Sequence, residues 1–110
     1  MINFNYLNEV FSGDAQLIDD VLDIYISEYP EFEARFANCM ARREMEEISK
    51  MAHKWQFTAK VLGLVELKND LIQLQDYANL TFHETDQLTT KVLGQVKEAF
   101  GQLLTHRTAS

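Results

Sequence analysis

Apolar residues recur at helical spacing along the chain, and no segment alternates polar and apolar residues for long enough to predict a strand. Residues 44–63 separate most clearly into two faces. The stripe predicted to be buried consists of Ile48, Met51, Ala52, Trp55, Ala59 and Leu62. The opposite stripe consists of Glu46, Ser49, Lys50, His53, Gln56, Phe57 and Lys60. We therefore expect the imidazole of His53 to face solvent or a partner.

The segment before these residues predicts a short helix and then a long one. Residues 4–11 carry apolar side chains that are expected to cover one end of the domain. After a turn, Asp14 is expected to cap a helix over about residues 15–40. Pro30 interrupts its hydrogen-bond ladder, but the apolar register continues on both sides, which favours one long bent helix over two. Residues 41–43 form a short connection that no glycine or capping residue marks.

A further helix is predicted directly after residues 44–63. Gly63 suits the left-handed backbone position that ends a helix. Residues 64–77 then carry another core-facing stripe. Its members are Leu67, Leu71, Leu74 and Ala78. A connection this short favours antiparallel neighbours.

Thr81 and Glu84 have the spacing of a capping box, which predicts that the last helix begins there. Its apolar residues predict an end near Leu104, followed by a polar, frayed tail over residues 105–110. The predicted fold is thus all-α, a single domain over residues 1–110. We expect an antiparallel up-down-up-down four-helix bundle with a short additional N-terminal helix.

Composition narrows the class of protein. With 110 residues and 46% hydrophobic content, the chain is large enough to bury one core without disulfides or a metal. Its net charge of -7 argues against a general nucleic-acid or anionic-membrane surface. The single cysteine, Cys39, fits the reducing cytoplasm. No signal peptide and no apolar run of about 20 residues is evident, which predicts a soluble, cytoplasmic protein.

The motifs of bundle metalloenzymes are absent from the sequence. Di-iron sites in bundles need Glu-x-x-His pairs, and none of His53, His83 and His106 has a glutamate three residues before it. No Gly-rich phosphate loop, nucleophile elbow or His-x-x-x-His spacing occurs either. We therefore expect no metal and no self-contained catalytic site, and a metal-dependent bundle enzyme is the least favoured class. His83 and His106 are expected to be solvated surface histidines.

Lysines gather around His53 instead. Of the six lysines in the chain, Lys50, Lys54 and Lys60 lie within seven residues of it. Nearby ammonium groups offset the charge of a phosphate, and their effect fades beyond a Debye length of ~8 Å at physiological salt. An anion at the imidazole is therefore favoured.

Several paired positions resemble the signature of histidine-containing phosphotransfer (HPt) domains. They are Ala52-His53, Thr58-Ala59 and Leu62-Gly63, followed by Leu67 and Leu74. The resemblance implies that His53 is the phosphoacceptor, whose Nε2 exchanges a phosphoryl group with an aspartate of a response-regulator receiver domain. It also implies a phosphoryl carrier without a bound cofactor, because the receiver supplies Mg²⁺ and the catalytic acids. The implied partners are receiver domains and hybrid sensor histidine kinases. A monomer is expected for a separate reason, because one compact bundle with a covered core needs no partner to fold.

Two residues depart from the family pattern. Gln56 stands where the family usually has Lys, and Phe57 where it usually has Gly. Gln56 can still support a phosphoryl group by hydrogen bonding, together with Lys50, Lys54 and Lys60. Phe57 either obstructs the imidazole or anchors the partner, with Ser49 and Gly63 as further docking residues. The alternative function is therefore a degenerate HPt-like module that binds receivers or kinases without transfer.

Overall fold

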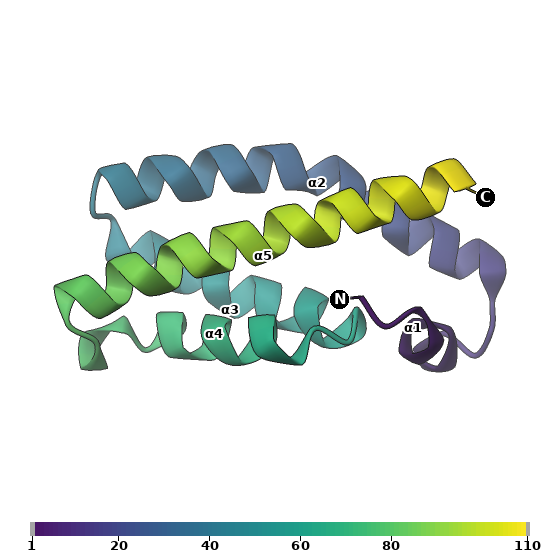
Figure 1. Ribbon diagram of the computed structural model, residues 1–110, viewed down its shortest axis with the longest axis horizontal. Coiled ribbons are helices and arrows are strands. Elements are labelled where there is room, and N and C mark those ends of the chain that lie inside the picture. Colours follow the sequence, from purple (N-terminus) through teal and green to yellow (C-terminus); the bar gives the residue numbers. More distant parts are fainter. Residues whose placement is uncertain (1, 110) are drawn as a thin grey trace.

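The computed structural model describes residues 2–109, with backbone only for residues 107–109, and these residues are helical throughout apart from their connections. The elements are α1 (Phe4–Val10), α2 (Ala15–Ala41), α3 (Met45–Val61), α4 (Val65–Gln75), a 3₁₀ turn η1 (Tyr77–Asn79) and α5 (Phe82–Ala109). The all-α prediction is confirmed. α2 and α4 each pack against both α3 and α5, and α1 lies at one end of this helical bundle (Figure 1).

α2 runs unbroken through Pro30, as the continuous apolar register predicted. In Figure 1 the direction of α2 changes along its length. Asp14 caps its start, because its Oδ1 accepts the backbone N–H of Leu17 at 3.1 Å. Pro30 is exposed, while Tyr29 and Phe32 beside it are buried, so the proline ring lies on the solvent side of the helix.

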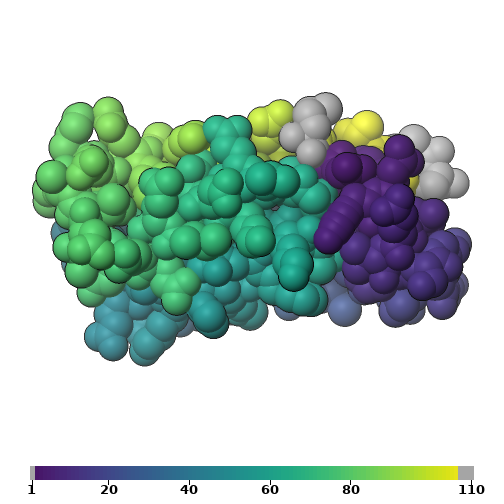
Figure 2. Space-filling model, turned by 90° about the horizontal axis from the view of Figure 1, so that it is seen from below, coloured from purple at the N-terminus to yellow at the C-terminus, as the bar shows by residue number. Residues whose placement is uncertain are grey.

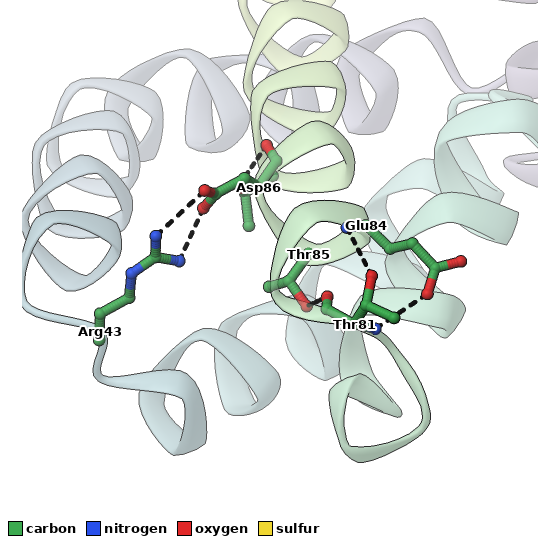
Figure 3. Close-up of polar contacts among 6 residues, drawn as sticks. Arg43, Thr81, Glu84, Thr85 and Asp86 are labelled. Atoms are coloured by element: carbon green, nitrogen blue, oxygen red, sulfur yellow. Dashed lines mark hydrogen bonds and ion pairs between the residues drawn. The ribbon is translucent and has the colours of Figure 1, made fainter.

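The connection between α2 and α3 has a capping arrangement that its sequence did not reveal. Arg43 adopts a left-handed backbone with φ of 57°. The N–H of Glu44 donates to the carbonyl of Cys39 at 3.0 Å, which closes the end of α2 as a Schellman motif does. The Arg43 guanidinium donates to both carboxylate oxygens of Asp86 on α5, at 2.6 and 3.0 Å (Figure 3). A tertiary ion pair thus accompanies a conformation that glycine usually supplies.

α4 is shorter than predicted, and one of its expected core residues is not buried. The helix ends at Gln75, and Ala78 lies exposed in η1 rather than on the core-facing stripe. Asp76 accepts a hydrogen bond from the Asn79 side chain at 2.7 Å within this turn. That local bond favours a tight turn over a continued helix.

The predicted capping box at the start of α5 is confirmed. Thr81 Oγ1 accepts the N–H of Glu84 at 3.1 Å, and Glu84 Oε1 accepts the N–H of Thr81 at 2.9 Å (Figure 3). The helix is formed through Ala109, beyond the end expected near Leu104. The predicted frayed tail therefore falls inside α5, except for residue 110, which lies outside the described residues.

The core has two parts. The larger part joins α2, α3, α4 and α5 around the aromatic side chains of Phe32, Phe36 and Trp55. The smaller part lies beneath α1, where Leu7 packs with Leu62 and other apolar residues. This arrangement confirms that the opening helix covers one end of the bundle.

Candidate functional site on the exposed face of α3

Packing fixes the orientation of α3. Ile48, Ala52 and Ala59 are fully buried, and Trp55 packs against the ring of Phe32 with centroids 4.3 Å apart. The predicted buried stripe is therefore confirmed. Acidic residues in the first turn and Lys60 in the last turn also match the direction of the helix dipole. A helix held in this way has little freedom to rotate, so its outer face is well defined.

His53 lies on that outer face and is exposed, as predicted. Phe57 follows one turn later, about 40° around the helix, and its side chain is 67% exposed. Because both rings are open to solvent, Phe57 does not bury the imidazole. The aromatic side chain instead stands beside His53 as a projecting apolar group.

Two of the predicted site residues are engaged in holding α3 against α4. Ser49 Oγ donates to the backbone carbonyl of Gln75 at 2.8 Å, and the side-chain amide of Gln56 donates to Gln75 Oε1. Both side chains are half-buried. The Gln56 amide carries two hydrogens, and the bond to Gln75 uses one of them.

The lysines around His53 lie in different electrostatic surroundings. Lys50 forms an ion pair with Glu47 at 3.4 Å, one turn back on the same helix. Lys54 lines a hollow between α2 and α3 that also contains Glu28 and Glu31. Their positive charge is therefore partly offset by neighbouring carboxylates.

Lys60 lies in a different setting. It is two turns after His53 and about 20° from it around the helix, roughly 10 Å away along the axis. It lines a groove of about 370 Å³ that we call the α1–α4 groove. The groove is lined by Asn3, Tyr6, Lys60, Gly63, Leu64, Val65, Lys68 and Asn69.

Gly63 is held in place by the N-terminal segment. Its φ is +71°, which confirms the left-handed position predicted at the end of α3. A Cβ at this position would lie 2.7 Å from Cβ of Asn3, and the N–H of Asn3 donates to the carbonyl of Leu62 at 2.9 Å. The glycine is therefore needed for the turn and for the close approach of Asn3. Its predicted contact with a partner stays a prediction.

Sequence reasoning missed the contribution of α4 to this face. Gln75 anchors Ser49 and Gln56, Lys68 lines the groove beside Lys60, and Val65 and Ile72 are exposed by 69% and 44%. One signal was available, since Val65 and Ile72 are apolar residues outside the core-facing leucine stripe of α4. The pairing with α3 was not visible without the packing of the two helices.

Outside this face the described residues offer little reactive chemistry. Burial raises the pKa of the Cys39 thiol, which keeps it protonated. Among residues 2–106, no three His, Cys, Asp or Glu side chains are grouped so that they could hold a metal ion. No helix in the described part of the chain combines the length and apolarity needed to cross a bilayer.

Comparisons with protein-family models, with curated proteins and with solved structures found no match to this chain. The chemistry of the site therefore rests on its own geometry. That geometry presents one exposed imidazole on a rigid helix, with amide and ammonium donors around it and an apolar ring beside it. Such a group can act as a nucleophile toward an electrophile that a partner brings.

Proposed function

We propose that this protein is a phosphorelay carrier of the HPt type, in which His53 receives a phosphoryl group from the aspartate of a receiver domain and returns it to one. In this proposal α2, α3, α4 and α5 form the antiparallel up-down-up-down four-helix bundle of that family, with α1 as the additional helix. The protein acts in the cytoplasm as a monomer, and its partners are receiver domains or hybrid sensor histidine kinases.

One observation carries the proposal: His53 is exposed on a helix that packing holds rigid. A phosphoryl carrier needs a nucleophile in a fixed orientation, because positioning and charge stabilisation supply most of the catalysis of phosphoryl transfer. The other catalytic parts belong to the partner, which brings Mg²⁺ and its own acids. This division of labour fits a site in which His53 has no hydrogen bond or ion pair to another described side chain.

The transfer step places simple demands on His53. The lone pair of Nε2 attacks the phosphorus of the phosphoaspartate, and an N–P bond forms as the P–O bond to the aspartate breaks. The aspartate leaves as a carboxylate, and the imidazole keeps its proton on Nδ1. The Gln56 amide can donate to a phosphoryl oxygen, while Lys50, Lys54 and Lys60 offset its charge.

A second function is favoured by Phe57. A side chain 67% exposed on the outermost line of α3 suits an apolar anchor at a protein interface. In this alternative the protein binds receivers or kinases without accepting phosphate, because the phenyl ring keeps the receiver's active-site loops away from His53. Partner binding would then be unaffected by His53→Ala.

The test of the first function is transfer from a phosphorylated receiver in the presence of Mg²⁺. We expect an acid-labile, base-stable label on the wild-type protein, and none on His53→Gln. His83→Gln is the matched control and should retain the label, because that histidine lies at the start of α5. Absence of label with several receivers would refute transfer by the wild-type protein.

Phe57→Gly distinguishes the two functions. If the wild-type protein is inert but binds receivers, and Phe57→Gly acquires transfer, the aromatic ring is the obstruction and the binding-only function is supported. If the wild-type protein transfers phosphate and Phe57→Gly binds receivers more weakly, the ring is a docking anchor of an active carrier. Lack of receiver binding by either protein would refute both functions.

A further inference from the structure

The α1–α4 groove is suited to a ligand that is both apolar and anionic. Its apolar lining residues include Leu64 and Val65, and Val65 is 69% exposed. Its polar lining residues are Asn3, Tyr6, Lys60, Lys68 and Asn69. Figure 2 shows the boundary at which it lies, where the purple surface of α1 adjoins the teal surface of α3 and α4.

The charge of this groove contrasts with the rest of the molecule. None of the described residues that line it carries a carboxylate, although the protein has 17 acidic and 10 basic residues. In the hollow between α2 and α3, Glu28 and Glu31 offset Arg35 and Lys54. The hollow between α4 and α5 is lined by Glu66 and Glu98. Neither Lys60 nor Lys68 forms an ion pair within the described residues. Lys60 and Lys68, without ion-pair partners and close to the exposed Val65, therefore favour binding of an anionic partner segment that carries an apolar side chain.

The position of the groove connects it to His53. Lys60 belongs both to the groove and to the line of α3 that carries His53, two turns away. A folded partner that reaches His53 covers more than the roughly 10 Å between these two residues, since a standard interface buries about 800 Å² on each partner. A partner engaged at His53 therefore also meets the groove.

We propose that the α1–α4 groove is a second docking site for the receiver domain, and that it receives an acidic segment of the receiver that carries an exposed aliphatic or aromatic side chain. The partner's identity rests on the proposed function. The apolar side chain fills the space beside Val65 and Tyr6, and its neighbouring carboxylates meet Lys60 and Lys68. This site supplies affinity and orientation, whereas His53 supplies the chemistry.

The test compares two phosphate donors on the same variants. The double variant combines Val65→Asp with Lys68→Glu, which alters the groove and leaves Lys60 and His53 in place. Val65 is the first residue of α4, where an aspartate favours the helix, so this variant is expected to fold. Lys97→Glu, at an exposed position of α5, is the control for the charge reversal in Lys68→Glu. Circular dichroism checks that all the variants are folded.

With a phosphorylated receiver as donor, we expect the double variant to lose about tenfold in the second-order rate constant, as a rise in the receiver concentration needed for half-maximal rate. With phosphoramidate, a small donor that needs no docking, labelling of His53 should be unchanged. Lys97→Glu should behave as wild type with both donors. Unchanged transfer from the receiver in the double variant would overturn the inference.

Failure of the proposed function gives a different pattern. If phosphoramidate labels His53 but no receiver transfers or binds, the docking inference is wrong and the histidine is merely reactive. If neither donor labels the protein, titration calorimetry with the receiver decides whether the groove is a docking site. Weaker binding by the double variant than by wild type supports the groove in a binding-only module, and equal or undetectable binding by both overturns it.

Discussion

Replacement of Gly63 by alanine tests whether the turn after α3 is held by two separate constraints. The first is the backbone, since φ of +71° is unfavourable for any residue with a Cβ. The second is the close approach of Asn3, whose Cβ would lie 2.7 Å from the new methyl group. Carbon atoms normally approach to about 3.5–4.0 Å, so the N-terminal segment must move by roughly 1 Å.

The expected loss follows from these two contributions. The left-handed conformation costs an alanine about 1 kcal/mol. Movement of Asn3 weakens its hydrogen bond of 2.9 Å to the carbonyl of Leu62, which contributes about 1 kcal/mol, and disturbs the packing under α1. We therefore expect Gly63→Ala to lower the free energy of unfolding by about 2–3 kcal/mol, which lowers Tm by roughly 10 °C.

Urea and thermal unfolding measure this loss, and a double-mutant cycle separates its parts. In an Asn3→Gly background the clash is absent, so Gly63→Ala should cost only the backbone contribution of about 1 kcal/mol. Gly94→Ala is the matched control, because a Cβ there meets no atom within 4 Å and α5 should gain about 0.5–1 kcal/mol. An equal loss in both backgrounds would refute the role of Asn3. No loss in either would refute both constraints.

Three further predictions concern other parts of the fold. Hydrogen bonding from Arg43 holds the pKa of Asp86 below its usual 3.8. The pair therefore stabilises the fold above pH 3.8 and loses this effect as the pH falls through the folded pKa. In urea titrations at decreasing pH, the difference in unfolding free energy between wild type and Asp86→Asn should shrink. Among the described residues the buried hydroxyl of Tyr29 makes no well-formed hydrogen bond, although the Glu33 carboxylate lies near enough to raise its pKa further than burial alone. Tyr29→Phe should therefore keep the ring stack on Phe100 and lower the free energy of unfolding in urea by less than about 1 kcal/mol. Burial raises the pKa of Cys39, so iodoacetamide should alkylate the native protein much more slowly than the protein in concentrated urea, and equal rates would contradict the packing of this thiol.

The helices were predictable where one local signal decided them. The stripe of α3, the cap at Asp14, the capping box at Thr81 and the left-handed Gly63 each depend on residues within one or two turns. Arg43 was not predictable in this way. Its left-handed backbone is accompanied by an ion pair to Asp86, which is distant in the sequence.

The boundaries of α4 and α5 show the same limit. Ala78 continues the apolar spacing of α4, but the hydrogen bond between Asp76 and Asn79 favours a turn there. The spacing of apolar residues does not show whether such a side-chain bond will replace the hydrogen bonds of the helix. The extension of α5 beyond Leu104 depends partly on the stacking of Phe4 on His106, with ring centroids 4.3 Å apart. That contact joins the two ends of the chain and leaves no local signature.

The candidate site divides along similar lines. The exposure of His53 followed from helical periodicity, because its own helix determines which side chains face the core. The surroundings of the lysines could not be predicted from periodicity, because they depend on side chains of α2 and α4. Proximity in sequence grouped Lys50, Lys54 and Lys60 as equivalent charges. In the folded protein, Lys50 and Lys54 lie near carboxylates of other residues. Lys60 instead lines the same groove as Lys68.

The distribution of charge over the whole chain changes what is required of Gln56. Residues 1–34 contain no lysine or arginine, whereas α3 and α4 together carry Lys50, Lys54, Lys60 and Lys68. α3 and α4 also carry Glu46, Glu47, Glu66 and Asp70, so their lysines and carboxylates balance, whereas α2 is strongly acidic. In the proposed carrier, an anionic partner is therefore repelled less by the face of His53 than by α2. Lys50 and Lys54, which lie within one turn of His53 on α3, would also act on a phosphoryl group at the imidazole, because the effect of a charge fades beyond ~8 Å. A neutral Gln56 can then serve as a hydrogen-bond donor that Gln75 holds in place, because the charge is supplied by residues on the surrounding turns.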